Sequence, residues 1–280
     1  MQIFRDMAAL DEGLASLRAD GGRIAMVPTM GALHEGHMAL VARAMALADH
    51  VVVSIFVNPR QFGPNEDLAA YPRREAQDAA LLREAGVAAL WAPTVDIMYP
   101  QGFSTSIHVA GVSEGLDGAA RPGHFDGVAT VVAKLFGQVR PDIACFGEKD
   151  YQQFAVIRQL VADLNLRVRI VGVPTQRAPD GLALSSRNAY LDAARRARAI
   201  ALPEMLVSAG EAIRAREDVP AILAWATRYL LDSGFESVDY VKLCDARTLV
   251  PLDRLDRPAR LLAAARIGGT RLIDNIAVNP

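Results

Sequence analysis

The residues whose types and spacing best fit a chemical role are His34 and His37, with Gly36 beside the second. They follow a short apolar run, Ile24–Val27, and precede a segment with helical character, Met38–Arg43. The sequence therefore places two imidazoles where a strand turns into a helix. The first N–H groups of a helix lack internal partners and its dipole is positive there, so such a terminus binds anions. Imidazoles at this point can donate hydrogen bonds to a phosphate, which indicates an enzyme that binds ATP.

The same histidine pair allows two other interpretations. Two polar side chains can simply cap the start of a helix, and histidine pairs also bind zinc. A zinc site needs further ligands, and no cysteine, aspartate or third histidine lies at ligand spacing from His34 and His37. Metal ligation is therefore less favoured, whereas the pattern alone leaves capping and phosphate binding both open.

Composition limits the classes of protein to which the chain can belong. Its 280 residues allow a large core and predict two domains, since one domain typically takes roughly 100–200 residues. The formal net charge of −2 predicts no nucleic-acid partner and no acidic-membrane partner. Apolar runs such as Val51–Val57 are far too short to span a bilayer, and the N-terminus lacks the pattern of a signal peptide.

The two cysteines, Cys145 and Cys244, are far apart, and each lies in an apolar run typical of a strand. Two buried free thiols are favoured over a disulfide. A cytoplasmic location is expected, because that compartment keeps thiols reduced. Neither cysteine has a nearby histidine that would indicate a nucleophile.

The first 175 residues alternate between strand-like and helix-like segments. Val- and Ile-rich runs predict strands over residues 23–27, 50–57, 88–92, 104–109, 143–146 and 168–173. Amphipathic segments predict helices over residues 36–48, 73–85, 128–139 and 151–164. Such alternation indicates a parallel sheet covered by helices, in which ligands bind beyond the carboxyl ends of the strands. The polar residues that follow strands belong to that edge: His34 and His37, Asn58 and Gln61, and Gly147–Asp150.

After Pro174 the pattern predicts a second, smaller α+β domain. Residues 175–188 are polar and turn-rich, as expected of a functional loop or linker. Pro203 falls inside the first of the following helix-like segments, where it is expected to bend or split the helix. These helices are predicted over residues 193–214 and 220–232, and strands over residues 237–243, 260–267 and 271–278. Gly268-Gly269 between the last two strands predicts a hairpin turn.

Four segments of the chain together resemble one family. They are Met30–His37, Phe56–Gly63, Phe146–Gln153 and Leu184–Asn188. In this order and spacing they are similar to the pantothenate synthetases, or pantoate–β-alanine ligases. The similarity continues to the final strand at Asp274–Ile276 and so covers essentially the whole chain.

The resemblance implies a fold and a reaction. The fold would be α/β, with an N-terminal Rossmann-like parallel sheet of the nucleotidyltransferase type over residues 1–175. Residues 176–280 would form a smaller α+β domain that closes as a lid. The ATP-dependent condensation of (R)-pantoate with β-alanine would proceed through pantoyl adenylate and release AMP and pyrophosphate, a step of coenzyme A biosynthesis. Magnesium and a homodimer are also implied.

The resemblance further implies roles for individual residues. His37, His34 and Lys149 would be catalytic. Contacts to ATP would come from Met30, Gly31, His34, His37, Gly147, Lys149, Asp150, Gln176, Leu184, Ser185, Ser186 and Arg187. Pantoate would contact Gln61, Gln153 and Met30, and β-alanine would contact Gln61. Weaker candidates for the site are Asn58, Tyr71 and Arg121.

Two positions depart from what relatives carry. Gln176 stands where an apolar residue is usual, so its side chain is not given a role, although its backbone can still contact the nucleotide. Gln77-Asp78 stands where relatives can carry consecutive acidic residues. This leaves Asp78 a doubtful ligand of Mg²⁺ and the protein ligands of the metal undetermined, since Mg²⁺ often rests on phosphates and water.

Three functions compete at this point. The ligase is favoured over another adenylyl-transferring enzyme of the same fold and over a non-catalytic nucleotide-binding protein. Gln61 and Gln153 separate the first from the second, because the resemblance places them in the acid pocket rather than around ATP. His37 and Lys149 speak against the third.

Overall fold

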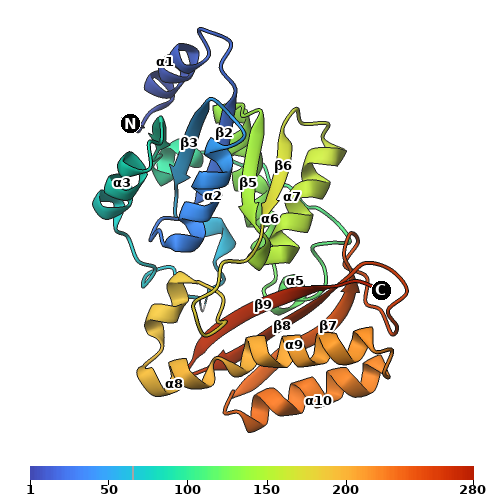
Figure 1. The fold of residues 1–280 in the computed structure, drawn as a ribbon. Helices are drawn as coiled ribbons and strands as arrows, with labels where there is room; N and C mark the ends of the chain where they lie inside the picture. The colour runs from blue at the N-terminus through green and yellow to red at the C-terminus, as the bar shows by residue number, and fades with distance from the viewer. Residues whose placement is uncertain (65) are drawn as a thin grey trace. The chain divides into compact units, whose positions relative to one another are not determined.

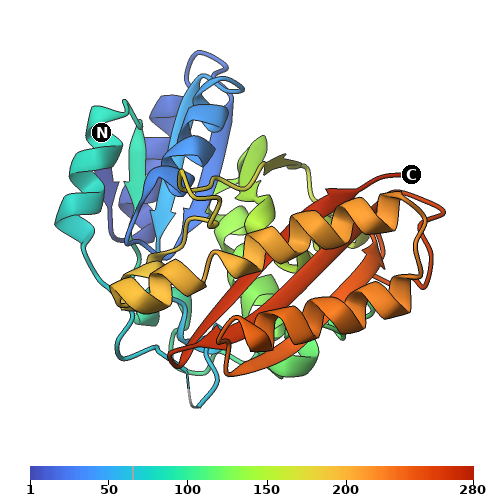
Figure 2. The ribbon, with the colours of Figure 1, turned by 60° about the horizontal axis from the view of Figure 1, so that its bottom comes forward.

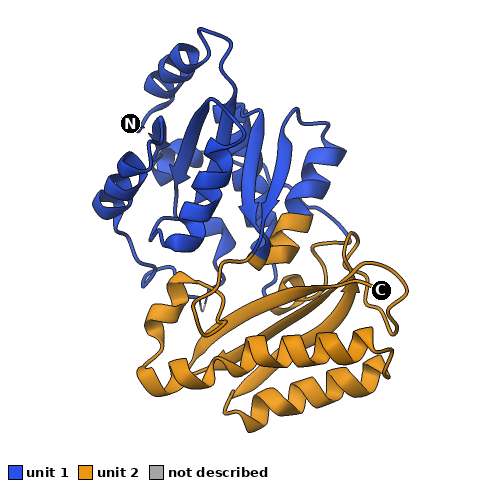
Figure 3. Ribbon diagram, in the orientation of Figure 1, with its two compact units in different colours: residues 1–110, 121–148, 156–174 blue, residues 111–120, 149–155, 175–280 orange. Residues whose placement is uncertain are grey.

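The computed structural model describes residues 1–64 and 66–280. They form two compact units (Figure 3): unit 1 comprises residues 1–110, 121–148 and 156–174, and unit 2 comprises residues 111–120, 149–155 and 175–280. The sequence pattern divides the chain once, after residue 175. In the structure, two short segments that precede residue 175 also belong to unit 2, and one of them carries Lys149, Asp150 and Gln153.

Unit 1 is built on a six-stranded parallel sheet in the order β1-β4-β3-β2-β5-β6 (Figure 1). Its strands are β1 (Gln2–Phe4), β2 (Ile24–Thr29), β3 (His50–Ile55), β4 (Ala89–Trp91), β5 (Ile143–Gly147) and β6 (Arg169–Val173). The chain runs outward from β2 through β3 to β4 and then returns to place β5 on the other side of β2. Ligands of such sheets bind beyond the strands' carboxyl ends where the order reverses, which here is between β2 and β5.

Helices cover both faces of this sheet. Ala25 and Val27 of β2 pack with Leu40 and Val41 of α2, while Met26, also fully buried, faces the other side because side chains alternate along a strand. The helices contributing to unit 1 are α1 (Met7–Leu17), α2 (Glu35–Met45), α3 (Glu75–Glu84), α4 (Val95–Met98), α6 (His124–Val139) and α7 (Tyr151–Asp163). The first residues of α7 belong to unit 2.

Three short 3₁₀ turns follow strands or loops that carry candidate site residues. They are η1 (Pro59–Gln61), η2 (Glu148–Asp150) and η3 (Ser186–Tyr190). The turn η1 comes after β3, and η2 comes directly after β5. The polar residues of these two turns therefore lie at the carboxyl ends of the strands, where the sequence predicts them.

Some predicted elements are wrong in detail. Residues 104–109 are not a strand, because Ile107 donates its N–H to the Thr130 hydroxyl (2.9 Å) instead of joining the sheet, and most of the segment is exposed. The helix α6 begins at His124 rather than at residue 128. The sequence pattern also misses β1, which is only three residues long, and α1 after it.

Unit 2 contains an antiparallel sheet of β7 (Ser237–Asp245), β8 (Ala259–Ile267) and β9 (Thr270–Val278). Helices α9 (Ala201–Arg214) and α10 (Val219–Asp232) lie across one face of it (Figure 2). Two shorter helices, α5 (Asp117–Ala120) and α8 (Ala193–Arg198), complete the unit. No helix formed by the described residues is long and apolar enough to cross a membrane.

Two local predictions for unit 2 are confirmed. The segment that contains Pro203 is split into α8 and α9, and Pro203 lies in the first turn of α9, where a missing N–H costs no internal hydrogen bond. Gly268 and Gly269 join β8 to β9 with φ angles of 59° and 74°. Positive φ at both positions is what a type I′ hairpin turn requires, and glycine adopts it without strain.

Candidate active site

The loop between β2 and α2 takes an unusual backbone path. Gly31 and Ala32 both have positive φ, 83° and 51°. This conformation costs a non-glycine residue about 1–2 kcal/mol. The carboxylate of Asp78, from α3, accepts the N–H groups of Ala32 (2.8 Å) and Leu33 (2.9 Å). Asp78 is buried, so these two charge-assisted bonds are well placed to offset the strain and to fix where α2 begins.

His34 is the N-cap of α2, and His37 lies in its first turn. The Nδ1 atom of His34 accepts the N–H of Gly36 (3.1 Å), and the Nδ1 atom of His37 accepts the N–H of His34 (3.3 Å). A neutral imidazole that accepts at Nδ1 carries its proton at Nε2. Capping and donation to a ligand are therefore compatible: one nitrogen of each ring caps the helix and the other is a donor.

The contacts of Asp78 bear on the search for metal ligands. Each of its oxygens already accepts a backbone N–H, so this carboxylate holds the loop before α2. Across residues 1–64 and 66–280, no group of three or more His, Cys, Asp or Glu side chains could hold a metal ion. A resident metal site is thus not apparent in the described part of the chain.

Met30, Asn58 and Gln61 are brought together at the carboxyl ends of β2 and β3. Asn58 donates from Nδ2 to Gln61 Oε1 (3.0 Å), and Gln61 Nε2 lies 3.1 Å from the sulfur of Met30. Tyr99 donates its hydroxyl to Asn58 Oδ1 (2.8 Å). Burial raises the pKa of Tyr99 to about 12, so its hydroxyl stays protonated as a donor. The Gln61 amide is therefore oriented by a chain of partners that starts at Tyr99.

Gly127 allows α6 to lie directly against η1. A Cβ at this position would stand 2.3 Å from the carbonyl oxygen of Arg60 and 2.8 Å from Cα of Gln61. The carbonyl of Gly127 also accepts a hydrogen bond from Asn58 Nδ2 (3.1 Å). The sequence analysis misses this role, because one glycine inside an amphipathic segment carries no signal of its distant neighbours.

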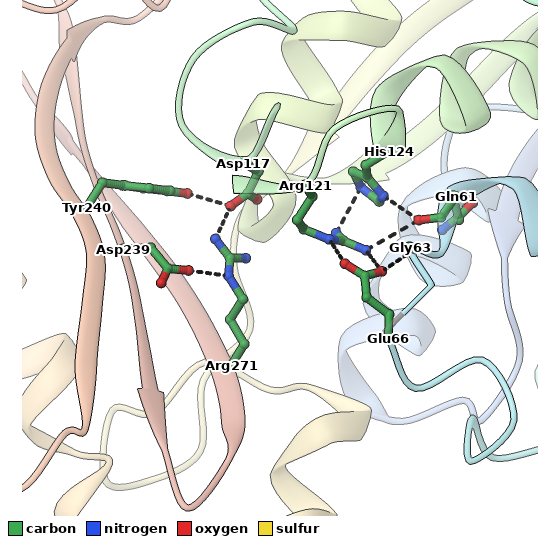
Figure 4. Close-up of polar contacts among 9 residues, drawn as sticks. All are labelled: Gln61, Gly63, Glu66, Asp117, Arg121, His124, Asp239, Tyr240 and Arg271. Carbon is green, nitrogen blue, oxygen red and sulfur yellow. Dashed lines mark hydrogen bonds and ion pairs between the residues drawn. The ribbon is translucent and has the colours of Figure 1, made fainter. Parts of the chain in front are cut away.

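The segment from Arg121 to His124 contacts the Gln61 region through a polar cluster (Figure 4). Arg121 binds both oxygens of Glu66, at 2.6 and 2.7 Å, and its Nη1 lies 3.0 Å from His124 Nε2. His124 Nδ1 lies 2.8 Å from the carbonyl oxygen of Gln61. Burial acts to raise the pKa of Glu66, but Arg121 and the N–H of Gly63 outweigh it and lower the pKa to about 2.

Two of the weaker candidates thus have protein partners. The guanidinium of Arg121 is engaged by Glu66, so a contact from it to a substrate carboxylate would require exchange with that side chain. Tyr71 is buried, and its ring packs edge-on against Phe62 with 5.8 Å between centroids. Their predicted contacts with substrate stay predictions.

In unit 2, Lys149 and Asp150 lie in η2, just after Gly147 ends β5. The ammonium of Lys149 is 3.6 Å from Asp150 Oδ1. Gln153 is half-buried, whereas the side chain of its neighbour Gln152 is buried and makes three hydrogen bonds. Gln152 donates to the carbonyls of residues 112 (2.9 Å) and 115 (2.7 Å) and accepts the N–H of residue 117 (2.9 Å). Gln152 therefore anchors the start of α7, and the sequence analysis misses it.

The loop that follows β6 also belongs to unit 2. Leu184 donates its N–H to the carbonyl of Gln176 (2.9 Å), and Arg177 pairs with Ala183, so residues 176–184 form a small hairpin. The side chain of Gln176 is exposed, and its backbone carbonyl closes the hairpin by accepting the N–H of Leu184. Ser185 caps η3 by accepting the N–H of Arg187 (3.3 Å). Leu184, Ser185, Ser186 and Arg187 are thus presented consecutively at one end of this hairpin.

Comparison with known proteins identifies the family of the chain. The family model of pantoate–beta-alanine ligase matches residues 2–277. A pantothenate synthetase from Rhizorhabdus wittichii is 64% identical over 280 residues, which cover 100% of this chain and 99% of the relative. The crystal structure of pantothenate synthetase from Thermus thermophilus is 46% identical with a TM-score of 0.90, and the match covers 100% of both chains.

A second crystal structure shows ligands. Pantoate–beta-alanine ligase from Francisella tularensis, complexed with beta-gamma ATP and beta-alanine, is 36% identical with a TM-score of 0.84. The match covers 99% of this chain and 97% of that one. The family model and these full-length matches show that the chain belongs to the pantoate–beta-alanine ligases, which condense pantoate and β-alanine with ATP.

Proposed function

We propose that this chain condenses (R)-pantoate with β-alanine in two steps, through an enzyme-bound pantoyl adenylate. In the first step a carboxylate oxygen of pantoate attacks the α-phosphorus of ATP, and the bond from that phosphorus to pyrophosphate breaks. In the second step the amine of β-alanine attacks the acyl carbon, AMP leaves, and the amine loses a proton as the amide forms.

The observation that carries this proposal is the hydrogen bonding at the start of α2. Both imidazoles accept backbone N–H groups at Nδ1, so both carry an N–H at Nε2. Their helix begins after β2, next to the point where the strand order reverses. We assign His34 and His37 as donors to the phosphates of ATP, because fixed donors stabilise charge that develops on phosphoryl oxygens.

Other residues take the remaining parts of the substrates. Lys149 supplies a positive charge for phosphate, Asp150 accepts from ribose hydroxyls, and Gly147 lets the backbone approach the nucleotide. The backbone of Gln176 and Leu184 contacts the nucleotide, while Ser185, Ser186 and Arg187 donate to phosphate oxygens. Gln61, held by Asn58 and Met30, binds the hydroxyl and carboxylate groups of pantoate and then β-alanine, and Gln153 assists with pantoate.

Several broader expectations belong to the same proposal. Magnesium arrives with ATP as part of the substrate, which agrees with the two backbone contacts of Asp78. A cytoplasmic location is supported by Cys145 and Cys244, which are buried and unpaired with each other. A homodimer and a lid role for residues 176–280 are carried over from the family resemblance, with residues 1–175 binding ATP and pantoate.

Pyrophosphate release from Mg-ATP tests the two-step reaction. With pantoate alone, purified protein should release pyrophosphate in a burst equal to the concentration of active sites. Adding β-alanine should convert the burst to steady turnover with AMP and pantothenate. A protein that binds ATP but releases no pyrophosphate with pantoate would contradict the proposed first step.

Substitutions test the assigned donors. H37A and K149A should each lower the adenylation rate at least about 10²-fold, as the removal of one fixed transition-state donor does. Matched controls are H50A, at the amino end of β3, and K134A, whose ammonium stacks on the ring of Phe103. The controls should adenylate normally, and normal rates in H37A or K149A would remove that residue from the mechanism.

A further inference from the structure

Two adjacent polar residues, Asp274 and Asn275, are buried in the middle of strand β9 of unit 2. Side chains alternate along a strand, so these two reach opposite faces of the sheet. Asp274 shares its face with Leu272 and Ile276, which pack with the core beneath α9 and α10. Asn275 faces the other side.

Asn275 binds the backbone of a candidate catalytic residue. Its Nδ2 donates to the carbonyl oxygen of Lys149 (2.9 Å), while its own backbone N–H is accepted by Asp274 Oδ1 (2.7 Å). The carbonyl belongs to the same residue as the ammonium that is assigned to phosphate. A rotation of this peptide would swing the Lys149 side chain, so the bond from Asn275 restricts where that charge can lie.

Asp274 binds the hairpin of residues 176–184. Arg177 donates to both oxygens of Asp274, at 2.6 and 2.9 Å, and Nη1 of the same guanidinium also donates to the carbonyl of Gly181 (3.0 Å). Two parallel bonds of this kind define the orientation as well as the position of the pair. The hairpin leads directly into Ser185, Ser186 and Arg187.

A further contact holds the Lys149 segment to the same strand. Arg271, on the face of β9 that carries Asn275, donates to Asp117 (2.6 Å), which also accepts the hydroxyl of Tyr240 (Figure 4). The backbone N–H of Asp117 is in turn accepted by Gln152, three residues after Lys149. The segment of residues 149–155 is therefore anchored to β9 at two points.

We propose that Asp274 and Asn275 are positioning residues for adenylation. Strand β9 joins two groups of nucleotide-binding residues, because Asn275 holds the Lys149 segment and Asp274 holds the hairpin that precedes Ser185. The strand thereby fixes the distance between the ammonium and the hydroxyls and guanidinium that contact the same ATP. This role rests on the proposed function of Lys149 and of residues 185–187.

Measuring the two half-reactions separately distinguishes a positioning role of Asn275 from a general effect of the substitution on folding. The full-length variant N275A should slow pyrophosphate formation from Mg-ATP and pantoate by about 10- to 10²-fold, as a misplacement on the order of 1 Å does. Pantothenate formation from supplied pantoyl adenylate and β-alanine should be nearly unchanged. No pyrophosphate leaves in that step, so the positive charge of Lys149 has no pyrophosphate to stabilise. A purely structural role would slow both half-reactions together.

A double-mutant cycle with K149A tests whether Asn275 acts through Lys149. In the K149A background, N275A should have no further effect on adenylation, since the group that it positions is absent. Additive losses would overturn the proposal. If N275A fails to fold, N275D keeps the shape of the side chain and removes the donor to Lys149, and it should show the same selective loss.

A matched control lies next to the same sheet, one residue before β7. Glu236 accepts the N–H groups of Gly268 (2.8 Å) and Gly269 (3.1 Å) at the β8–β9 turn, and E236Q should leave both half-reactions unchanged. Normal adenylation in both N275A and K149A would refute the proposed function of Lys149 and, with it, the positioning role. A loss in K149A with normal rates in N275A would refute the positioning role alone.

The contact between Asp274 and Arg177 is tested by the affinity for Mg-ATP. D274N removes the charge that holds Arg177, so it should raise the dissociation constant for Mg-ATP by about tenfold, as displacement of a binding group does, without changing that for pantoate. R177Q should do the same, and the double variant should lose no more than either single one. Equal weakening of ATP and pantoate binding would show a general structural effect and overturn the assignment.

Discussion

Replacing Gly127 with alanine should disturb the pantoate pocket that we propose around Gln61. Gly127 lies within α6, where a new Cβ would stand 2.3 Å from the carbonyl oxygen of Arg60 and 2.8 Å from Cα of Gln61. Both neighbours are backbone atoms, which cannot rotate away as the end of a side chain can. Since such atoms need about 3.5 Å, the η1 turn has to retreat by roughly 1 Å.

The size of the effect follows from this displacement. Overpacking typically costs about 1–3 kcal/mol, and the better helix propensity of alanine returns at most about 1 kcal/mol. Because Gln61 would move with the turn, kcat/KM for pantoate should fall by about 10²-fold, the loss that a misplacement of this size can cause. ATP affinity should be unchanged, since the clash does not involve the loop before α2.

The assay is steady-state pyrophosphate release over a range of pantoate concentrations, together with thermal unfolding. The matched control is G137A on the same helix, where a Cβ would meet no atom within 4 Å. That variant should keep its kinetics and gain up to about 1 kcal/mol in free energy of unfolding. Normal kinetics toward pantoate in G127A would refute the reasoning, and so would equal losses in the two variants.

The other predictions concern stability and reactivity. D78N should lower the free energy of unfolding in urea by about 1.5–3 kcal/mol, because an amide accepts only one of the two loop N–H groups that the carboxylate accepts. The pKa of Glu66 falls from 4.5 to about 2 on folding, so its pair with Arg121 should stabilise the protein above pH 4.5 and lose that effect as the pH falls toward 2. Unfolding free energies of wild type and E66Q, compared from pH 2 to 5, should therefore converge at the acid end. Burial raises the pKa of Cys145 to about 11 and that of Cys244 to about 12, so a thiol reagent at pH 8 should label neither in the native protein and both in denaturant.

Much of the functional assignment could be read from the sequence because its signals are local. A strand, a turn and a helix start can be recognised within one short stretch of chain, and His34 and His37 fall within such a stretch. Gly268-Gly269 and Pro203 likewise act through their own backbone, and both predictions are confirmed. The strand predicted over residues 104–109 is wrong because its alternation is local too, whereas pairing depends on a distant partner.

The residues that position the site could not be found in this way. Asp78 reaches the loop before α2 across 46 residues, and Asn275 reaches Lys149 across 126. Neither contact leaves a periodic or spaced pattern, because only the folded chain brings the two groups together. The sequence by itself thus determined the family, the alternating elements and the side chains that we propose contact the substrates. Only the tertiary structure decided which nitrogen of each imidazole accepts a backbone N–H and which buried carboxylates and amides bind the loops around the candidate site, because hydrogen bonds depend on distance and direction in space.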